Sequence, residues 1–133
     1  MFISEKIIIL GCMDIYLDVT YTLLLVDSVL DLKIGDVVYN KSLCNSCFIT
    51  AFNPSGNLVD IETNCGLNDN LMNYILDNNF EYYHGYGHLN DWVENSFLIK
   101  DISIFESLSL SNELEQLAFI YINSNGLVEL HYT

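Results

Sequence analysis

The chain has 133 residues, of which 51% are hydrophobic, and a formal net charge of −14 at pH 7. A chain of this length can bury a core without disulfides. Its high hydrophobic content excludes intrinsic disorder. Its apolar runs, such as Leu23 to Val26, are far shorter than the roughly 20 residues of a membrane span, and the first ten residues lack the basic start and long apolar core of a signal peptide. We therefore expect a soluble, cytoplasmic protein with a single domain over residues 1–133.

The first third of the chain predicts a β-hairpin. Residues 20–26 are β-branched and aromatic and then continuously apolar, which indicates a buried strand. Asp27 and Ser28 favour a turn, and residues 29–34 alternate in a way that suits a partner strand. Before this hairpin, residues 6–10 form either a strand or the start of a helix, and residues 13–19 have helix-compatible spacing.

The next segment predicts a short helix and then a strand with an abrupt end. Asp36 is placed to cap a helix over residues 37–43. Residues 48–52 form a strand that ends at the corner Asn53-Pro-Ser-Gly56, because proline fixes its own φ and favours an extended conformation for Asn53. Such a polar corner is either an ordinary turn or part of a functional site.

Two helices are predicted in the second half. Asp60 is the expected N-cap of the first, with Glu62 in its first turn and Asn78-Asn79 at its end. Its apolar stripe is Ile61, Cys65, Leu71, Met72, Ile75 and Leu76. The second helix covers residues 102–116, with a possible break near Ser111.

The remaining segments predict strands. Residues 80–87 are aromatic, with two close glycines that suggest a bulge or a close backbone approach, and residues 92–99 form the next strand after a turn. Residues 118–122 and 127–132 form a hairpin around Asn-Gly. This order predicts an α+β fold, in which a largely antiparallel sheet has two main helices packed on one face.

The charge is the strongest compositional signal. The chain contains eighteen carboxylates and only four lysines, and no arginine is present. This balance disfavours direct binding to nucleic acid and favours encounter with a basic protein or nucleoprotein, although an acidic surface also serves solubility alone. Carboxylates in turns or on polar helix faces are the expected contact residues: Asp27, Asp31, Asp60, Asp69, Asp77 and Glu81.

The cysteines give a weaker signal. Cys44 and Cys47 have C-x-x-C spacing, which serves zinc or thiol redox chemistry, but no second such pair exists. His84 and His88 could complete a zinc site only if the fold brought them alongside. We expect two reduced cysteines that flank a turn, and neither a metal nor a cofactor.

Three polar segments resemble a known family when they are taken together. They are Thr50-Ala-Phe-Asn-Pro54, then Asn64, and then Trp92-Val-Glu-Asn-Ser-Phe-Leu98, with Gly87 between them and Gln116 after them. This pattern is similar to an uncharacterised bacterial domain-of-unknown-function family (DUF3293-like) of small cytoplasmic proteins, over about residues 21–132 and with Leu32-Lys-Ile-Gly35 at its start. Asn95 departs from the family, which often has proline there. The resemblance implies a shared set of polar positions and no mechanism.

That set, Asn53, Asn64, Glu94 and Gln116, has two interpretations. It forms either a buried network that satisfies backbone groups near Pro54, or a pocket with Glu94 as general base, where a pairing of Glu94 with His88 is conceivable. We therefore hold two hypotheses for function. The first is an acidic binding or inhibitor protein, such as a phage anti-defence protein, a CRISPR inhibitor or an immunity protein, that competes with a phosphate ligand on a basic partner. The second is a small enzyme or ligand-binding domain.

Overall fold

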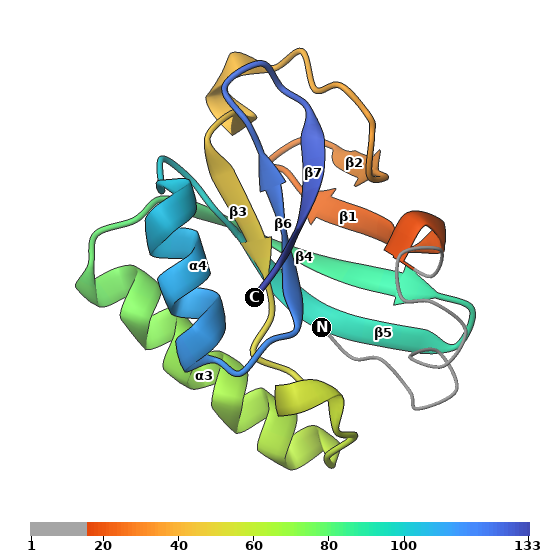
Figure 1. Ribbon diagram of the computed structural model, residues 1–133, viewed down its shortest axis with the longest axis vertical. Coiled ribbons are helices and arrows are strands. Elements are labelled where there is room, and N and C mark those ends of the chain that lie inside the picture. Colours follow the sequence, from red (N-terminus) through yellow and green to blue (C-terminus); the bar gives the residue numbers. More distant parts are fainter. Residues whose placement is uncertain (1–15) are drawn as a thin grey trace.

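The computed structural model describes residues 16–133 and confirms the α+β fold. In this part of the chain, seven strands form one antiparallel sheet in the order β2-β1-β4-β5-β3-β6-β7 (Figure 1). The strands are β1 (Thr20–Leu24), β2 (Val29–Leu32), β3 (Ser46–Ile49), β4 (Tyr82–Leu89), β5 (Trp92–Ile99), β6 (Ala118–Ile122) and β7 (Val128–Tyr132). The main helices are α3 (Ile61–Asp77) and α4 (Ile104–Glu113). The predicted element at residues 6–10, most of that at 13–19, and Cys12 lie outside the described residues.

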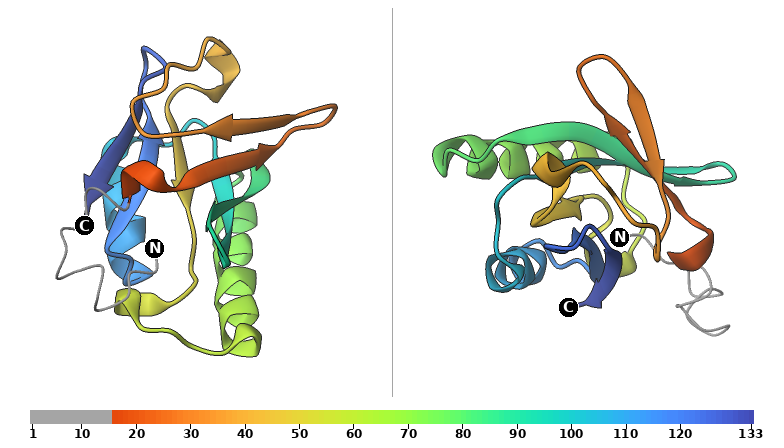
Figure 2. Two further views of the ribbon diagram at one scale, coloured as in Figure 1. Left: turned by 90° about the vertical axis from the view of Figure 1, so that its right-hand side faces the viewer. Right: turned by 90° about the horizontal axis from the view of Figure 1, so that it is seen from above.

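The sheet curls until its two edges approach each other. The segment after β2 contacts β7: Gly35 N donates to Val128 O at 2.9 Å, and Val128 N donates to Asp36 O at 2.9 Å. Val37 and Leu127 form an isolated antiparallel bridge beside them. At the other end of β2, the β1–β2 hairpin projects away from the body of the molecule (Figure 2).

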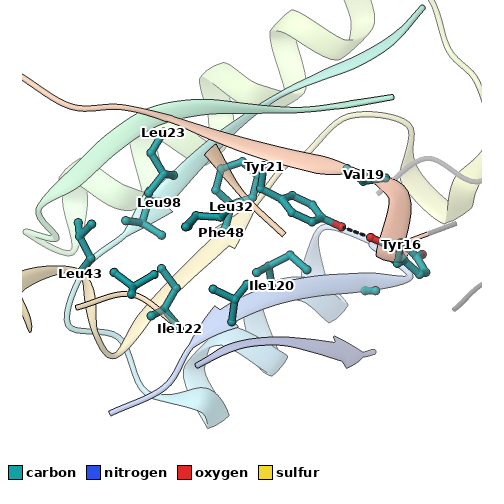
Figure 3. Packing of buried hydrophobic residues seen from close by; sticks show 13 residues of the cluster. Tyr16, Val19, Tyr21, Leu23, Leu32, Leu43, Phe48, Leu98, Ile120 and Ile122 are labelled. Atoms are coloured by element: carbon teal, nitrogen blue, oxygen red, sulfur yellow. Dashed lines mark hydrogen bonds between the residues drawn. The ribbon is translucent and has the colours of Figure 1, made fainter. Parts of the chain in front are cut away.

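The curled sheet has a core on each side. Inside the curl lie Tyr21, Leu23, Phe48, Leu98 and Ile120 with their neighbours, and the Tyr21 hydroxyl donates to Tyr16 O at 3.5 Å (Figure 3). On the outside, α3 packs against β5 and α4 packs against β3 and β6. The residues of this second core include Ile49, Leu71, Ile75, Phe97 and Leu110. Both helices thus cover the outer face, as predicted, and the inner face is filled by side chains of the sheet and its loops.

Several predicted boundaries are wrong. No helix covers residues 37–43: only a 3-10 turn, η1 (Lys41–Leu43), forms there, and Asn40 caps it. Asp36 instead accepts a hydrogen bond from Lys33 N at 2.8 Å within a tight turn. The strand predicted at 48–52 is β3, which ends at Ile49. The last helix begins after its N-cap Ser103 and continues through Ser111 without a break.

The apolar stripe predicted for α3 is only partly buried. Leu71 and Ile75 are in the core, but Ile61 and Leu76 are 66% and 53% exposed. The buried face of α3 begins instead with Asn64 and Asn68. Its first half therefore faces a polar neighbour, which is the segment after β3.

Two glycines are needed for close packing. A Cβ on Gly85 would clash with the Thr22 carbonyl oxygen and lie 2.8 Å from Phe48 Cε2, which confirms the predicted close approach. Gly126, in the predicted turn between β6 and β7, has a φ of 85°.

None of the helices in residues 16–133 is both long and apolar enough to cross a membrane.

Candidate functional site: a buried amide network and an adjoining groove

The segment Thr50–Asn53 leaves the sheet, and side chains satisfy its backbone. Ala51 N donates to Asn68 Oδ1 at 2.9 Å, and Phe52 N donates to Thr50 Oγ1 at 3.0 Å. Both Thr50 Oγ1 and Asn68 Nδ2 donate to Asn95 O, at 2.6 and 3.0 Å. An irregular segment thereby stays buried at low cost, because buried backbone groups need a partner.

Asn53 adopts a left-handed conformation, with φ 50° and ψ 62°, and not the extended one predicted from Pro54. Asparagine tolerates this region better than most residues, and here Asn64 holds it from two sides. Asn53 N donates to Asn64 Oδ1 at 2.8 Å, and Asn64 Nδ2 donates back to Asn53 Oδ1 at 3.0 Å. Asn53 Oδ1 also accepts from Val59 N at 3.1 Å. The two amides therefore fix the turn that leads into α3.

Glu94 and Gln116 complete this group of side chains around the segment Thr50–Asn53. We call the group the amide network, and its members are Thr50, Asn53, Asn64, Asn68, Glu94 and Gln116. Asn53 Nδ2 donates to Glu94 Oε2 at 3.0 Å, and Gln116 Nε2 donates to Phe52 O at 3.0 Å. Glu94 is only 1% exposed. Burial, followed by the charges of Tyr16 and Glu94, raises the pKa of the Tyr21 phenol far above its ordinary value.

The structure thus brings together Asn53, Asn64, Glu94 and Gln116 around one segment of backbone. Sequence reasoning missed Asn68, which bonds the same segment. The available signal was its spacing, since Asn68 lies one helical turn after Asn64 on α3 and so on the same face.

The conceivable pairing of Glu94 with His88 is wrong. In the β4–β5 register Glu94 lies opposite Gly87, and His88 lies opposite Val93. Since neighbouring residues of a strand point to opposite faces, Glu94 and His88 lie on different sides of the sheet. His88 Nε2 lies 3.0 Å from Thr22 Oγ1, whose single hydrogen is donated to Asp31 Oδ1 at 2.6 Å.

A groove of about 410 Å³ adjoins the network on the outer face of the sheet. It lies between the first half of α3 and strands β1, β4 and β5, and we call it the α3 groove. Four rings line it, together with polar side chains that include Asp69, Asn68, Asn95 and Ser96. Glu94 does not line it, because Glu94 lies on the same face of β5 as Leu98 of the inner core.

All six carboxylates predicted to contact a partner are exposed, but only some of them make a side-chain hydrogen bond or an ion pair. Asp60 caps α3, and the hydrogen bond from Thr63 N lowers the pKa of its carboxyl group. Asp31 accepts from Thr22, and Glu81 lies 3.2 Å from Lys100 Nζ. The other three make no side-chain hydrogen bond or ion pair within residues 16–133; they are Asp27, Asp69 and Asp77.

The C-x-x-C cysteines flank a turn, as expected. Cys44 follows η1 and is half-buried, whereas Cys47 lies in β3 and is fully buried. Burial raises the pKa of the Cys47 thiol to about 12, despite an opposing hydrogen bond with Ser107. Within residues 16–133 no group of three or more His, Cys, Asp or Glu side chains is placed to hold a metal ion.

The fold and the network define a small α+β protein whose first long helix and sheet are joined by buried asparagines. A family model described as a protein of unknown function (DUF3293) matches residues 49–119, more than half of the chain, so the chain belongs to this family. The match spans the amide network from Thr50 to Gln116 but is shorter than the resemblance over residues 21–132, and Leu32–Gly35 lies outside it. Neither the curated proteins nor the solved structures contain a match.

Proposed function

We propose that this protein is a small, acidic, cytoplasmic binding or inhibitor protein that docks on a basic, nucleic-acid-handling partner. The observation that carries the proposal is the distribution of charge. Of the 16 carboxylates in residues 16–133, 14 are exposed, whereas this part of the chain contains only three lysines. One of these, Lys100, is already paired with Glu81. A phage anti-defence protein, such as a CRISPR inhibitor, or an immunity-type protein has this physical character, and its carboxylates would compete with phosphate for the partner's basic surface.

The amide network supports the same proposal. An enzyme built on Glu94 would need access for substrate, but Glu94, Asn53 and Gln116 are 1%, 3% and 3% exposed. Asn53 and Asn64 make their hydrogen bonds to each other, to nearby backbone and, from Asn53 Nδ2, to Glu94. A closed network of this kind holds the loop and helix in place and leaves the binding role to the surface.

The three carboxylates without a bond in the described part of the chain allow a clean test. In the variant Asp27→Asn/Asp69→Asn/Asp77→Asn, three charges disappear and no described hydrogen bond is lost. The matched control, Asp27→Glu/Asp69→Glu/Asp77→Glu, keeps the charges at the same positions. The partner is captured from the native host at low salt, and its binding kinetics are then measured with both variants.

We expect the neutralised variant to bind with a lower on-rate and a nearly unchanged off-rate, because long-range attraction acts on encounter. Affinity should also fall steeply with salt, since the Debye length shrinks from about 10 Å at about 0.1 M to about 3 Å at about 1 M. A partner whose affinity ignores both salt and the three substitutions would overturn the proposal. The acidic surface would then serve solubility alone.

A further inference from the structure

The α3 groove combines aromatic walls with one carboxylate. Phe52, His84, Tyr86 and Phe97 supply the rings, and Asp69 stands on the exposed side of α3. His84 is exposed and Tyr86 is half-buried, so both rings are accessible from solvent. Residues that line the groove on β1, β5 and α3 are exposed as well, so this part of the outer face is open to solvent.

No lysine of the described chain lines the groove. Lys100 pairs with Glu81 and lies 5.7 Å from the centre of the Tyr83 ring, and Lys33 donates to Asp18 O at 3.4 Å. Lys41 belongs to η1. A second copy of this chain is a poor occupant, since it would bring another 14 negative charges. Charge complementarity therefore calls for a cationic group from a different protein.

The chemistry of the lining favours arginine over lysine. A guanidinium group is planar, stacks on aromatic rings and donates paired hydrogen bonds to a carboxylate, whereas an ammonium group is a compact and strongly hydrated point charge. The groove offers Tyr86 and His84 for stacking and Asp69 as the acceptor. This chain has no arginine of its own. We propose that the α3 groove receives an arginine side chain presented by the basic partner, an inference that rests on the proposed function and assigns its contact point.

The first test uses a small probe and needs no partner. The isotope-labelled protein is titrated with N-acetyl-arginine amide and, separately, with N-acetyl-lysine amide while amide chemical shifts are recorded by NMR. We expect the arginine probe to shift amides around Asp69, Tyr86 and Asn95 in a saturable way, and the lysine probe to bind at least about fivefold more weakly.

Variants then locate the contact. Asp69→Asn should weaken the arginine probe about fivefold or more, whereas Asp77→Asn should change it less than about twofold. Asp77 is a matched control because it is also an exposed aspartate of α3 but does not line the groove. Tyr86→Leu keeps an apolar side chain and removes the stacking surface, so it should weaken arginine more than lysine. Thermal melts of all variants report whether each one is folded.

Two results would overturn this inference: equal, diffuse shifts with both probes, or equal effects of Asp69→Asn and Asp77→Asn. The captured partner separates this failure from failure of the proposed function. If binding to the partner remains salt-dependent while Asp69→Asn matches Asp77→Asn, the acidic docking stands and the groove assignment fails. If partner binding is insensitive to salt, the proposed function itself fails.

Discussion

Substitution of Asn68 by alanine tests whether the amide network stabilises the fold. Asn68 is 8% exposed and joins three elements: its Oδ1 accepts from Ala51 N, and its Nδ2 donates to Asn95 O in β5. In Asn68→Ala, Asn95 O keeps a partner, because Thr50 Oγ1 also donates to it. Ala51 N, in contrast, loses the acceptor that satisfies it.

The expected magnitude follows from that one stranded group. A buried donor left without a partner costs about 1–3 kcal/mol. Alanine is a better helix former than asparagine, which returns up to about 0.7 kcal/mol. We therefore expect Asn68→Ala to lower the free energy of unfolding by about 1–2 kcal/mol, or the melting temperature by about 4 °C per kcal/mol for a chain of this size.

The matched control is Asn73→Ala, which makes the same change on an exposed face of α3. It carries the gain in helix propensity without the lost hydrogen bonds, so it should be neutral or stabilising. Urea unfolding followed by circular dichroism gives the free energy of unfolding for each variant. Equal stability of Asn68→Ala and Asn73→Ala would refute the argument that side-chain amides hold the segment Thr50–Asn53.

Three further predictions follow. Glu94→Ala leaves Asn53 Nδ2 without its acceptor and should cost about 1–3 kcal/mol of stability. Glu94→Gln keeps an acceptor for the Asn53 side chain and should leave partner binding unchanged; loss of binding by a fully stable Glu94→Gln would make the carboxylate a binding residue. Gly85→Ala should destabilise the protein by about 1–3 kcal/mol or more, because the new Cβ would meet Thr22 O and Phe48. Gly66→Ala has open space around it in α3 and should stabilise the protein by about 1 kcal/mol. Urea unfolding measures both variants, and similar effects would contradict the close approach of β1 and β4. Iodoacetamide at pH 8 should modify exposed Cys65 well before Cys47, because the Cys47 pKa of about 12 leaves almost no thiolate. Peptide mass spectrometry measures the order of labelling, and early labelling of Cys47 would show that β3 is accessible.

The sequence alone determined the features that depend on neighbouring residues. The strands at 92–99 and 118–122 follow from local composition, and the hairpin turn near Gly126 follows from its preference for positive φ. Asp60 caps α3 because its side chain reaches Thr63 N, only three residues away. The polar set Asn53, Asn64, Glu94 and Gln116 was also visible in the sequence, through the family pattern and through polar residues in apolar surroundings.

Only the tertiary structure decided how distant segments share their polar groups. Periodicity marked Ile61 and Leu76 as core residues, yet α3 turns Asn64 and Asn68 inward because the backbone after β3 has no strand to pair with. The left-handed conformation of Asn53 depends on Asn64, which lies in another element. Likewise, Glu94 and His88 are six residues apart in the sequence, but the register of the β4–β5 hairpin places them on opposite faces. Such outcomes depend on long-range hydrogen bonds and on register, which local residue preferences do not encode.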